Sequence, residues 1–213
     1  MTDTVIFDLD GTLLNTLDDL HTSVNHALVN CGFKCRTREE IRQFLGNGVR
    51  ELIRCSLPDF TEESTLNKVL ECFRQYYLIH NSDQTKPYEG IMNMLTKCKK
   101  MGYHTAIVSN KPDFAVQELY HSFFSEVVDV AIGEKPGIPR KPSPEMVHKA
   151  VDMLGSALET SVYVGDSEVD IATAKNSGMR CISVSWGFRD KSFLVNNGAE
   201  TIIDMPEELF DRL

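Results

Sequence analysis

Residues 3–16, DTVIFDLDGTLLNT, decide the fold of this 213-residue chain. The apolar run Val5–Phe7 is typical of a buried β-strand, and it ends in Asp8 and Asp10, which are separated by one leucine. Residues i and i+2 of an extended chain point to the same side, so the two carboxylates converge. Close carboxylates are unfavourable unless one is protonated or a cation lies between them. The stretch therefore predicts a proton or cation site at the end of a strand.

Short apolar runs rich in β-branched residues recur along the rest of the chain, at residues 105–108, 127–132, 162–164, 181–184 and 201–203. They are nearly continuous rather than alternating, which suits strands buried on both faces. Helical patterns at 89–101, 144–154 and 168–177 lie between them, and each is followed by a glycine, the usual residue after a helix end. Strands alternating with helices predict an α/β fold with a doubly wound, parallel, Rossmann-like sheet.

The interval between the first two strands is anomalous, because about a hundred residues separate them and one crossover needs far fewer. Its apolar stripes indicate four helices, the second opened by a capping box of Thr37 and Glu40 and the fourth capped by Thr61. We expect a core domain of residues 1–15 and 86–213 and a helical cap subdomain of residues 16–85. The cap would leave and re-enter near the carboxyl end of the first strand and lie over it.

The composition excludes some partners. There are 22 basic and 31 acidic residues, a formal charge of −9, which argues against nucleic acid or an anionic membrane. No apolar run reaches the length of a membrane helix and no signal peptide is visible, so a cytoplasmic protein is expected, as a monomer or homodimer.

The six cysteines are scattered and indicate reduced thiols. The close pair Cys31 and Cys35, with His21 and His26, leaves a metal site as an alternative.

Polar groups follow the predicted strands at the edge where open α/β sheets bind ligands. Beyond Asp8 and Asp10 these are Ser109 and Asn110, then Asp166 and Asp170, and Lys141 ahead of the helix at 144. Few hard oxygen ligands, with room for water and phosphate, are the Mg²⁺ pattern. Lysine supplies a charge for phosphate, a glycine such as Gly11 allows close backbone approach, and Thr12 adds a hydroxyl and an N–H for anionic oxygens.

Each of these signals alone has a plain structural explanation. The two aspartates with one residue between them are often a turn, and KPSPE (141–145) could be a helix opening capped by Ser143. GDSEVD (165–170) could be another helix N-terminus, with acids favoured by the helix dipole. Lys111 could add positive potential to the site or be a surface lysine, and Asp113 reads as a helix start. All the signals together, in this order at strand ends, favour a phosphoryl-transfer site.

Four segments together resemble the motifs of the haloacid dehalogenase-like hydrolases: FDLDGTLLNT (7–16), VSNKP (108–112), RKPSPEM (140–146) and VGDSEVD (164–170). The similarity is closest to the phosphoglycolate phosphatase-like branch, which has a helical cap between the first and second motifs. The segment FLGNGVREL (44–52) also looks like a cap stretch of that branch. One departure is Asn15, where the family often has aspartate.

The resemblance implies roles for these residues. Asp8 would be the nucleophile that forms an aspartyl-phosphate, and Asp10 would protonate the leaving oxygen and then deprotonate the attacking water. Mg²⁺ would be bound by Asp8, Asp166 and the Asp10 backbone carbonyl, with Asp170 a further ligand directly or through water. The phosphoryl oxygens would be bound by Ser109, Lys141 and backbone N–H groups near Leu9, Gly11 and Asn110.

The resemblance implies a Mg²⁺-dependent phosphatase for a small phosphorylated metabolite, with phosphoglycolate the best single candidate. Arg50 and Asn47 of the cap are candidates for the non-transferred end of the substrate, although Arg50 could equally be a solvated helix charge. A phosphomutase, a pyrophosphatase and a non-catalytic phospho-acceptor protein are the alternatives. Asp10 argues against the last, because a carrier would keep its aspartyl-phosphate whereas an enzyme with this acid should discharge it.

Overall fold

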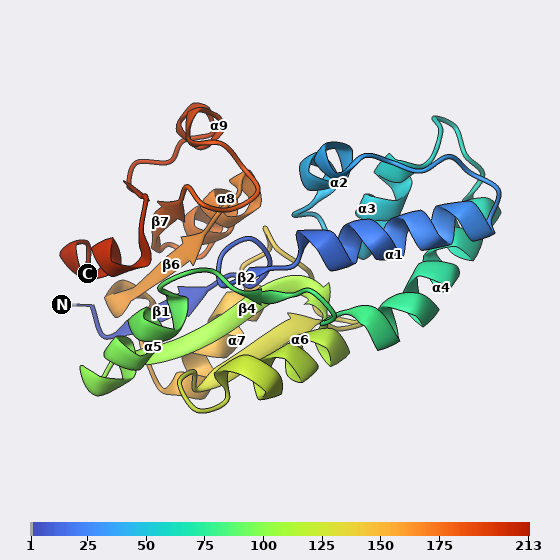
Figure 1. Ribbon diagram of the computed structural model, residues 1–213. Coiled ribbons are helices and arrows are strands. Elements are labelled where there is room, and N and C mark those ends of the chain that lie inside the picture. The colour runs from blue at the N-terminus through green and yellow to red at the C-terminus, as the bar shows by residue number, and fades with distance from the viewer. Residues whose placement is uncertain (1) are drawn as a thin grey trace. The chain divides into compact units, whose positions relative to one another are not determined.

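The computed structural model describes residues 2–213, which form two compact units (Figure 1). One unit contains the residues up to Leu14 together with Pro87–Leu213, and the other is Asn15–Lys86. We call them the core unit and the helical unit. The chain thus crosses between units after Leu14 and after Lys86, whereas the sequence places the crossings after residues 15 and 85. No helix within residues 2–213 is both long and apolar enough to cross a membrane.

The core unit is built on a six-stranded sheet whose described pairings are all parallel, as predicted. The strand order is β5-β4-β1-β6-β7-β8, with bounds β1 Thr4–Phe7, β4 His104–Pro112, β5 Val130–Glu134, β6 Ser161–Gly165, β7 Arg180–Val184 and β8 Ile202–Ile203. Phe7 at the end of β1 lies opposite Ile107 on one side and Val164 on the other. The chain order reverses between β1 and β6, so the ligand crevice of a doubly wound fold is expected beyond these two strands.

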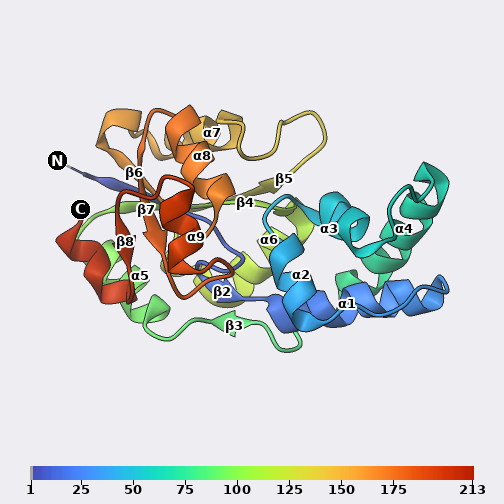
Figure 2. The ribbon, with the colours of Figure 1, turned by 90° about the horizontal axis from the view of Figure 1, so that it is seen from above.

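Helices cover both faces of this sheet (Figure 2). Their bounds are α5 Ile91–Lys100, α6 Asp113–Leu119, a π-helical turn Tyr120–Phe124, α7 Glu145–Leu154, α8 Glu168–Asn176 and α9 Lys191–Asn196, with 3₁₀ turns at Leu158–Thr160 and Pro206–Asp211. Val5 and Phe7 pack with residues of α5 and α6, while Ile6 packs with residues of α7. Successive side chains of β1 therefore enter two different cores, which explains its continuously apolar sequence.

Some predicted element boundaries differ from the structure. The strand expected from residue 127 begins at Val130, because the backbone N–H groups of Val127 and Val128 donate to the Phe124 carbonyl and close the preceding turn. Strand β4 continues past Val108 to Pro112, with a register shift against β5 between these residues. Helix α7 has Pro144 as its N-cap rather than Ser143. The polar residues after Val108 therefore extend β4 beyond the apolar run 105–108 from which the strand was predicted.

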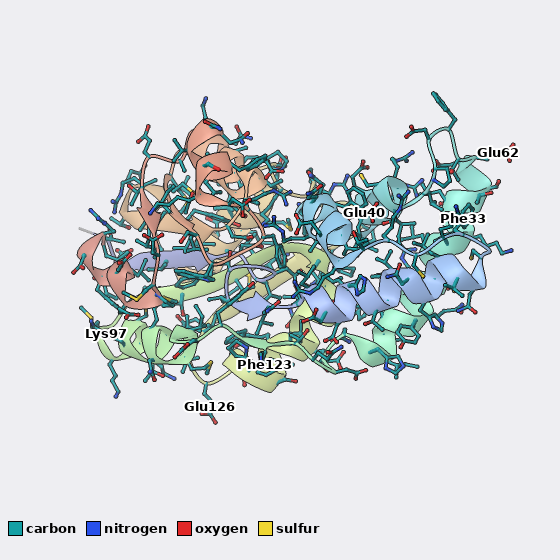
Figure 3. The ribbon with its side chains drawn as sticks, turned by 45° about the horizontal axis from the view of Figure 1, so that its top comes forward. Phe33, Glu40, Glu62, Lys97, Phe123 and Glu126 are labelled. Carbon is teal, nitrogen blue, oxygen red and sulfur yellow. The ribbon has the colours of Figure 1, made fainter. Side chains whose placement is uncertain are left out.

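The helical unit contains α1 Leu17–Asn30, α2 Arg38–Phe44, α3 Val49–Ser56 and α4 Glu63–His80. The predicted capping box is present: Glu40, labelled in Figure 3, accepts from the Thr37 backbone N–H, and the Glu40 N–H donates to the Thr37 hydroxyl. The predicted cap of the fourth helix is wrong. Glu62 is the N-cap of α4, and the Thr61 hydroxyl donates instead to the Pro58 carbonyl at 2.6 Å. The Thr61 hydroxyl therefore takes part in a local turn and does not cap the helix.

Both crossings of the chain are in short strands, β2 Leu14–Asn15 and β3 Lys86–Pro87, which pair in a separate two-stranded sheet. Within the helical unit, Asp19 in the first turn of α1 accepts hydrogen bonds from the backbone N–H groups of Gln84 and Thr85 and from the Thr85 hydroxyl. Asp19 is 2% exposed. The beginning and the end of the helical unit are therefore fastened to each other by one buried carboxylate.

Candidate active site

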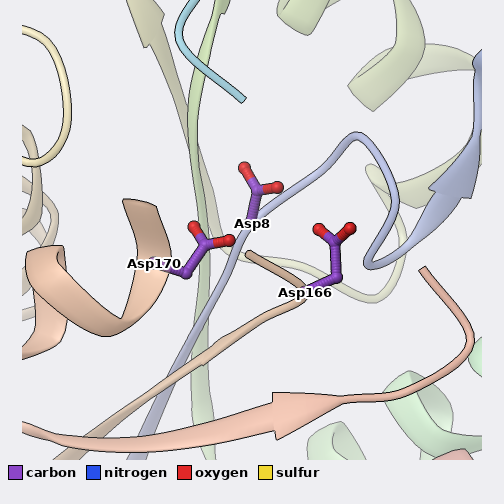
Figure 4. Close-up of side chains that lie close together, drawn as sticks. All are labelled: Asp8, Asp166 and Asp170. Atoms are coloured by element: carbon purple, nitrogen blue, oxygen red, sulfur yellow. The ribbon is translucent and has the colours of Figure 1, made fainter. Parts of the chain in front are cut away.

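Three buried carboxylates meet beyond the carboxyl ends of β1 and β6 (Figure 4). Asp8 directly follows β1, Asp166 directly follows β6, and Asp170 is in the first turn of α8. One oxygen from each lies within 4.8 Å of the others, and among residues 2–213 this is the one group of three or more such ligands. The parallel sheet brings the three together because its strand ends share one edge.

Lys141 ties two of these carboxylates together. Its Nζ atom lies 2.7 Å from Asp8 Oδ1, 2.8 Å from Asp170 Oδ1 and 2.9 Å from the Tyr163 hydroxyl. The lysine is 3% exposed, so the ammonium is bound by protein groups in place of water. Tyr163 was not predicted from the sequence as a member of the site, because it lies inside an apolar strand and its hydroxyl is the single sign of this role.

The site holds an excess of negative charge. Asp8, Asp10, Asp166 and Asp170 supply four carboxylates, and Lys111 and Lys141 supply two ammonium groups that pair with three of them, which leaves two formal negative charges. Burial raises the pKa of Asp8 to about 7, against the opposing effect of Lys141.

Two further pKa shifts follow from the same crowding. Burial, with the neighbouring charges of Asp170 and Asp8, raises the pKa of Asp166 well above its usual range. Burial by itself would lower the pKa of Lys141, but Asp170 and Asp8 outweigh burial and raise it. The lysine therefore stays charged, while the uncompensated carboxylates favour uptake of protons or of a cation.

Asp166 is oriented by two loops. Its Oδ2 atom accepts from the Phe188 backbone N–H at 2.7 Å, and its Oδ1 atom accepts from the Thr12 hydroxyl at 3.1 Å. A Cβ atom on Gly11, whose φ is +89°, would collide with this carboxylate, and a Cβ on Gly187 would collide with it as well. Both glycines therefore allow the backbone to pass close to Asp166.

The hydrogen bonds of Thr12 and Gly11 differ from the expectation that they face a substrate. The Thr12 hydroxyl is directed at Asp166, and its backbone N–H donates to the Leu9 carbonyl at 3.3 Å. The Gly11 N–H donates to the Leu14 carbonyl at 2.9 Å. These donors close the turn after β1, because a tight turn must satisfy its own backbone groups. Trp186 closes the same turn, since its Nε1 donates to the Thr12 carbonyl at 3.0 Å.

The end of β4 contributes three consecutive buried residues. The Asn110 side chain exchanges two hydrogen bonds with the Lys141 backbone, accepting from its N–H at 2.8 Å and donating to its carbonyl at 3.0 Å. The Ser109 hydroxyl accepts from the Lys111 N–H at 3.2 Å. Lys111 is 4% exposed and its Nζ lies 2.9 Å from Asp10 Oδ1, so the surface-lysine interpretation is wrong. Asp113 begins α6, as expected.

Arg50 and Asn47, the candidates for substrate contact in the helical unit, lie in or next to α3. Arg50, in α3, pairs with Glu63 and donates to Asn67 Oδ1 at 2.9 Å. Asn47 is half-buried just ahead of α3. Their contact with a substrate stays a prediction, and the ion pair of Arg50 agrees with the alternative of a structural helix charge.

Asp170 uses both of its oxygens within the core unit. Oδ1 accepts from Lys141, and Oδ2 accepts from the Ser167 hydroxyl at 2.6 Å and from the Ser167 N–H at 3.1 Å, which forms a capping box at the start of α8. The helix-start interpretation of this segment is therefore correct, and it coexists with membership of the carboxylate cluster. One side chain both caps a helix and orients the buried lysine.

Comparison with known proteins identifies the family of this chain. Residues 5–184 match the haloacid dehalogenase-like hydrolase family, so the chain belongs to that family. A phosphoglycolate phosphatase of Aquifex aeolicus is 32% identical over 86% of this chain and 85% of its own length. The pyrophosphatase PpaX of Bacillus mycoides is 28% identical over 97% of this chain and 94% of its own.

A solved structure also resembles this chain over its whole length. The crystal structure of a phosphoglycolate phosphatase candidate from Lactobacillus delbrueckii subsp. bulgaricus superposes with a TM-score of 0.94. It is 37% identical, and the match covers 100% of this chain and 98% of that one. The family, the fold and these relatives identify the chain as an enzyme of the phosphatase class.

Proposed function

We propose that this chain is a Mg²⁺-dependent phosphatase that hydrolyses a small phosphate monoester through an aspartyl-phosphate, with phosphoglycolate as the best candidate substrate. The observation that carries the proposal is the buried cluster at the β1–β6 crevice, where Asp8 lies beside Lys141 and the carboxylates exceed the ammonium groups by two charges. The phosphoglycolate phosphatase relative at 32% identity supports the choice of substrate.

The residues present fit Mg²⁺. The donors are carboxylate oxygens, the hard ligands that this ion prefers, and carboxylates outnumber ammonium groups at the site. Asp8 and Asp166 would bind it with the Asp10 backbone carbonyl, and Asp170, whose oxygens already accept from Lys141 and Ser167, would act through water. When bound, the ion would neutralise the carboxylates and the phosphoryl oxygens.

In the proposed reaction, an Asp8 carboxylate oxygen forms a bond to phosphorus while the bond from phosphorus to the substrate oxygen breaks. Asp10, which is protonated when this step begins, gives its proton to that leaving oxygen. Water then attacks phosphorus, the bond from Asp8 to phosphorus breaks, and Asp10 takes the proton of the water. Lys141 and Ser109 would offset the charge on the phosphoryl oxygens, as the phosphate clamps of other transferases do.

Inorganic pyrophosphate is the second candidate substrate. The PpaX relative matches nearly the whole chain at 28% identity and carries the name of a pyrophosphatase. The same steps apply, with phosphate as the leaving group. The discriminating contacts would involve the far end of the substrate, for which Arg50 and Asn47 remain the candidates.

Phosphate release from a panel of compounds tests the proposal. The panel contains 2-phosphoglycolate, sugar phosphates, nucleotides and pyrophosphate, each with Mg²⁺ and with EDTA. Metal-dependent release with a clear preference for 2-phosphoglycolate supports the proposal, and preference for pyrophosphate favours the second candidate. No release from any compound contradicts a phosphatase. Transfer of phosphate between sugar positions is then followed, since a mutase would retain the phosphoryl group.

A further inference from the structure

The ion pair between Lys111 and Asp10 is separate from the contacts of Lys141. Lys111 Nζ lies 2.9 Å from Asp10 Oδ1, and the two side chains are 2% and 20% exposed. Lys141 contacts Asp8 and Asp170. The site therefore contains two buried lysines with different carboxylate partners, and the one on Asp10 has no role in the reaction described above.

The backbone of β4 explains how Lys111 reaches this position. The register against β5 shifts between Val108 and Pro112, so the strand end departs from a regular pleat. Bulges of this kind redirect side chains and are frequent beside active sites. Here the adjacent residues serve different partners: Asn110 is bonded to the Lys141 backbone and Lys111 to the Asp10 side chain.

Burial of the ion pair between Lys111 and Asp10 restricts the conformations of both side chains. Removing an ammonium group from water is unfavourable, and a long side chain loses rotamer freedom when it is fixed. The pair with Asp10 offsets this cost when the Nζ and the carboxylate stay together, so each side chain limits the conformations of the other. The contact uses Oδ1 of Asp10, so a reacting group would meet the second oxygen, Oδ2.

We propose that Lys111 is the positioning residue for Asp10: it fixes the carboxyl through Oδ1 so that Oδ2 faces the leaving oxygen of the substrate. This inference rests on the proposed function, in which Asp10 is the proton donor of the first step. In that step the bond from Asp8 to phosphorus forms, the bond from phosphorus to the leaving oxygen breaks, and the proton of Asp10 passes to that oxygen.

The proposal predicts a dependence on the leaving group. An alkoxide is a poor leaving group and needs the proton, whereas the acetate released from acetyl phosphate does not. Loss of Lys111 should therefore slow transfer from an alkyl phosphate and spare transfer from acetyl phosphate. General damage to the site would slow both equally.

The experiment compares wild type, Lys111→Met and Lys111→Arg in single turnover with Mg²⁺, using 2-phosphoglycolate, glycerol 2-phosphate and acetyl phosphate. Consumption of substrate is measured because it reports the first step, and the later attack of water is common to all three. For Lys111→Met we expect a loss of about a hundredfold with the alkyl phosphates and less than about fivefold with acetyl phosphate. Lys111→Arg, which keeps a cation, should restore most of the alkyl rate.

Lys135→Met is the matched control, since it removes another lysine–aspartate pair of the core unit, that with Asp113, in which the lysine is half exposed. It should leave all three rates unchanged. Equal losses on alkyl and acyl substrates in Lys111→Met overturn the positioning role, while the phosphatase proposal stands. If Lys111→Met does not fold, the same comparison is made with Lys111→Arg. Failure of wild type to consume any of the three, together with no release from any compound of the panel above, overturns the phosphatase proposal, and the inference with it.

Discussion

The two units of this protein use charged residues in opposite ways. In the core unit, Asp8, Asp166, Asp170 and Lys141 are all less than one-tenth exposed. Lys141 pairs with Asp8 and Asp170, and one oxygen of Asp166 lies within 4.8 Å of oxygens of these two carboxylates. In the helical unit, pairs such as Arg38–Asp18 and Arg36–Glu40 lie at the surface, with side chains about a third to a half exposed. Surface pairs contribute about 0–1 kcal/mol each, whereas buried charges strongly affect pKa and ligand binding.

This difference teaches where charge changes should act. Replacing a charge in the core cluster should alter chemistry more than folding, because the cluster is already strained by its excess of carboxylates. Replacing a surface charge of the helical unit should alter little. Asp19 is the exception within the helical unit, because it is buried and accepts three protein hydrogen bonds. Its loss should act on folding.

The largest expected effect is that of Asp8→Asn. The amide keeps the shape but is no nucleophile, so we expect phosphate release to fall by about 10⁴-fold or more while thermal unfolding stays close to wild type. Asp204→Asn, which removes an exposed carboxylate paired with Lys191 in the same unit, is the control and should retain activity. An Asp8→Asn enzyme with near-normal turnover would remove Asp8 from the nucleophile role.

Asp19→Ala should have the next largest effect, on stability. Three donors, including two backbone N–H groups, would lose a charged acceptor, which should cost about 3 kcal/mol of unfolding free energy. Denaturant unfolding measures this. The neighbouring Asp18→Ala, which breaks the exposed pair with Arg38, should change stability by less than about 1 kcal/mol. Equal effects of the two variants would contradict the assigned difference between buried and exposed carboxylates.

Gly187→Ala should weaken metal binding and activity by about 10- to 100-fold, because its Cβ would displace Asp166. Titration of Mg²⁺ against activity measures the change. Gly178→Ala is the control: φ is +72° there but an added Cβ meets nothing within 4 Å, so it tests backbone strain without a collision. It should lower stability by about 1 kcal/mol and leave the metal requirement intact. If both variants behave alike, close approach at Asp166 is not the cause.

The smallest expected effect is a pH dependence of Mg²⁺ binding. The folded, metal-free protein has an Asp8 pKa of about 7 against an ordinary value of 3.8, so between these values it retains a proton that the unfolded chain has released. Raising the pH through this window lowers the free energy of unfolding of the metal-free protein, and the slope flattens above about 7.

Mg²⁺ must compete with that proton. Its affinity should tighten about tenfold between about pH 6 and about pH 8 and then level off, measured as the shift in thermal unfolding midpoint with Mg²⁺ concentration. Asp8→Asn provides the control, because it has no carboxyl to titrate at this position. A wild-type affinity that is flat across this range would contradict the raised pKa of Asp8.

Much of the fold was predictable because its signals are local. The apolar runs marked all six strands of the large sheet, and the glycines after α5, α7 and α8 marked their ends within a residue or two. The capping box at Thr37 was also correct, because its partners are three residues apart. The prediction that Thr61 caps the fourth helix was wrong, although that signal is also local. Two nearby partners, the helix end and the Pro58 carbonyl, compete for the Thr61 hydroxyl, and the carbonyl binds it.

The contacts across the site were less predictable. Lys111 and Asp10 are 101 residues apart, and Tyr163 and Lys141 are 22 apart, so their pairing depends on strand order and on the bulge of β4. Thr12 could have faced a substrate or a neighbour, and the direction of its hydroxyl toward Asp166 follows from the closed turn after β1.

The sequence by itself determined the alternation of strands and helices, the long helical insertion and the residue types at the strand ends, because each depends on periodicity and on neighbours along the chain. The tertiary structure alone decided which carboxylate pairs with which lysine, which glycines press against Asp166, and how far burial raises the pKa of Asp8. Those properties depend on desolvation and on distances between segments far apart in the chain, and a linear pattern contains neither.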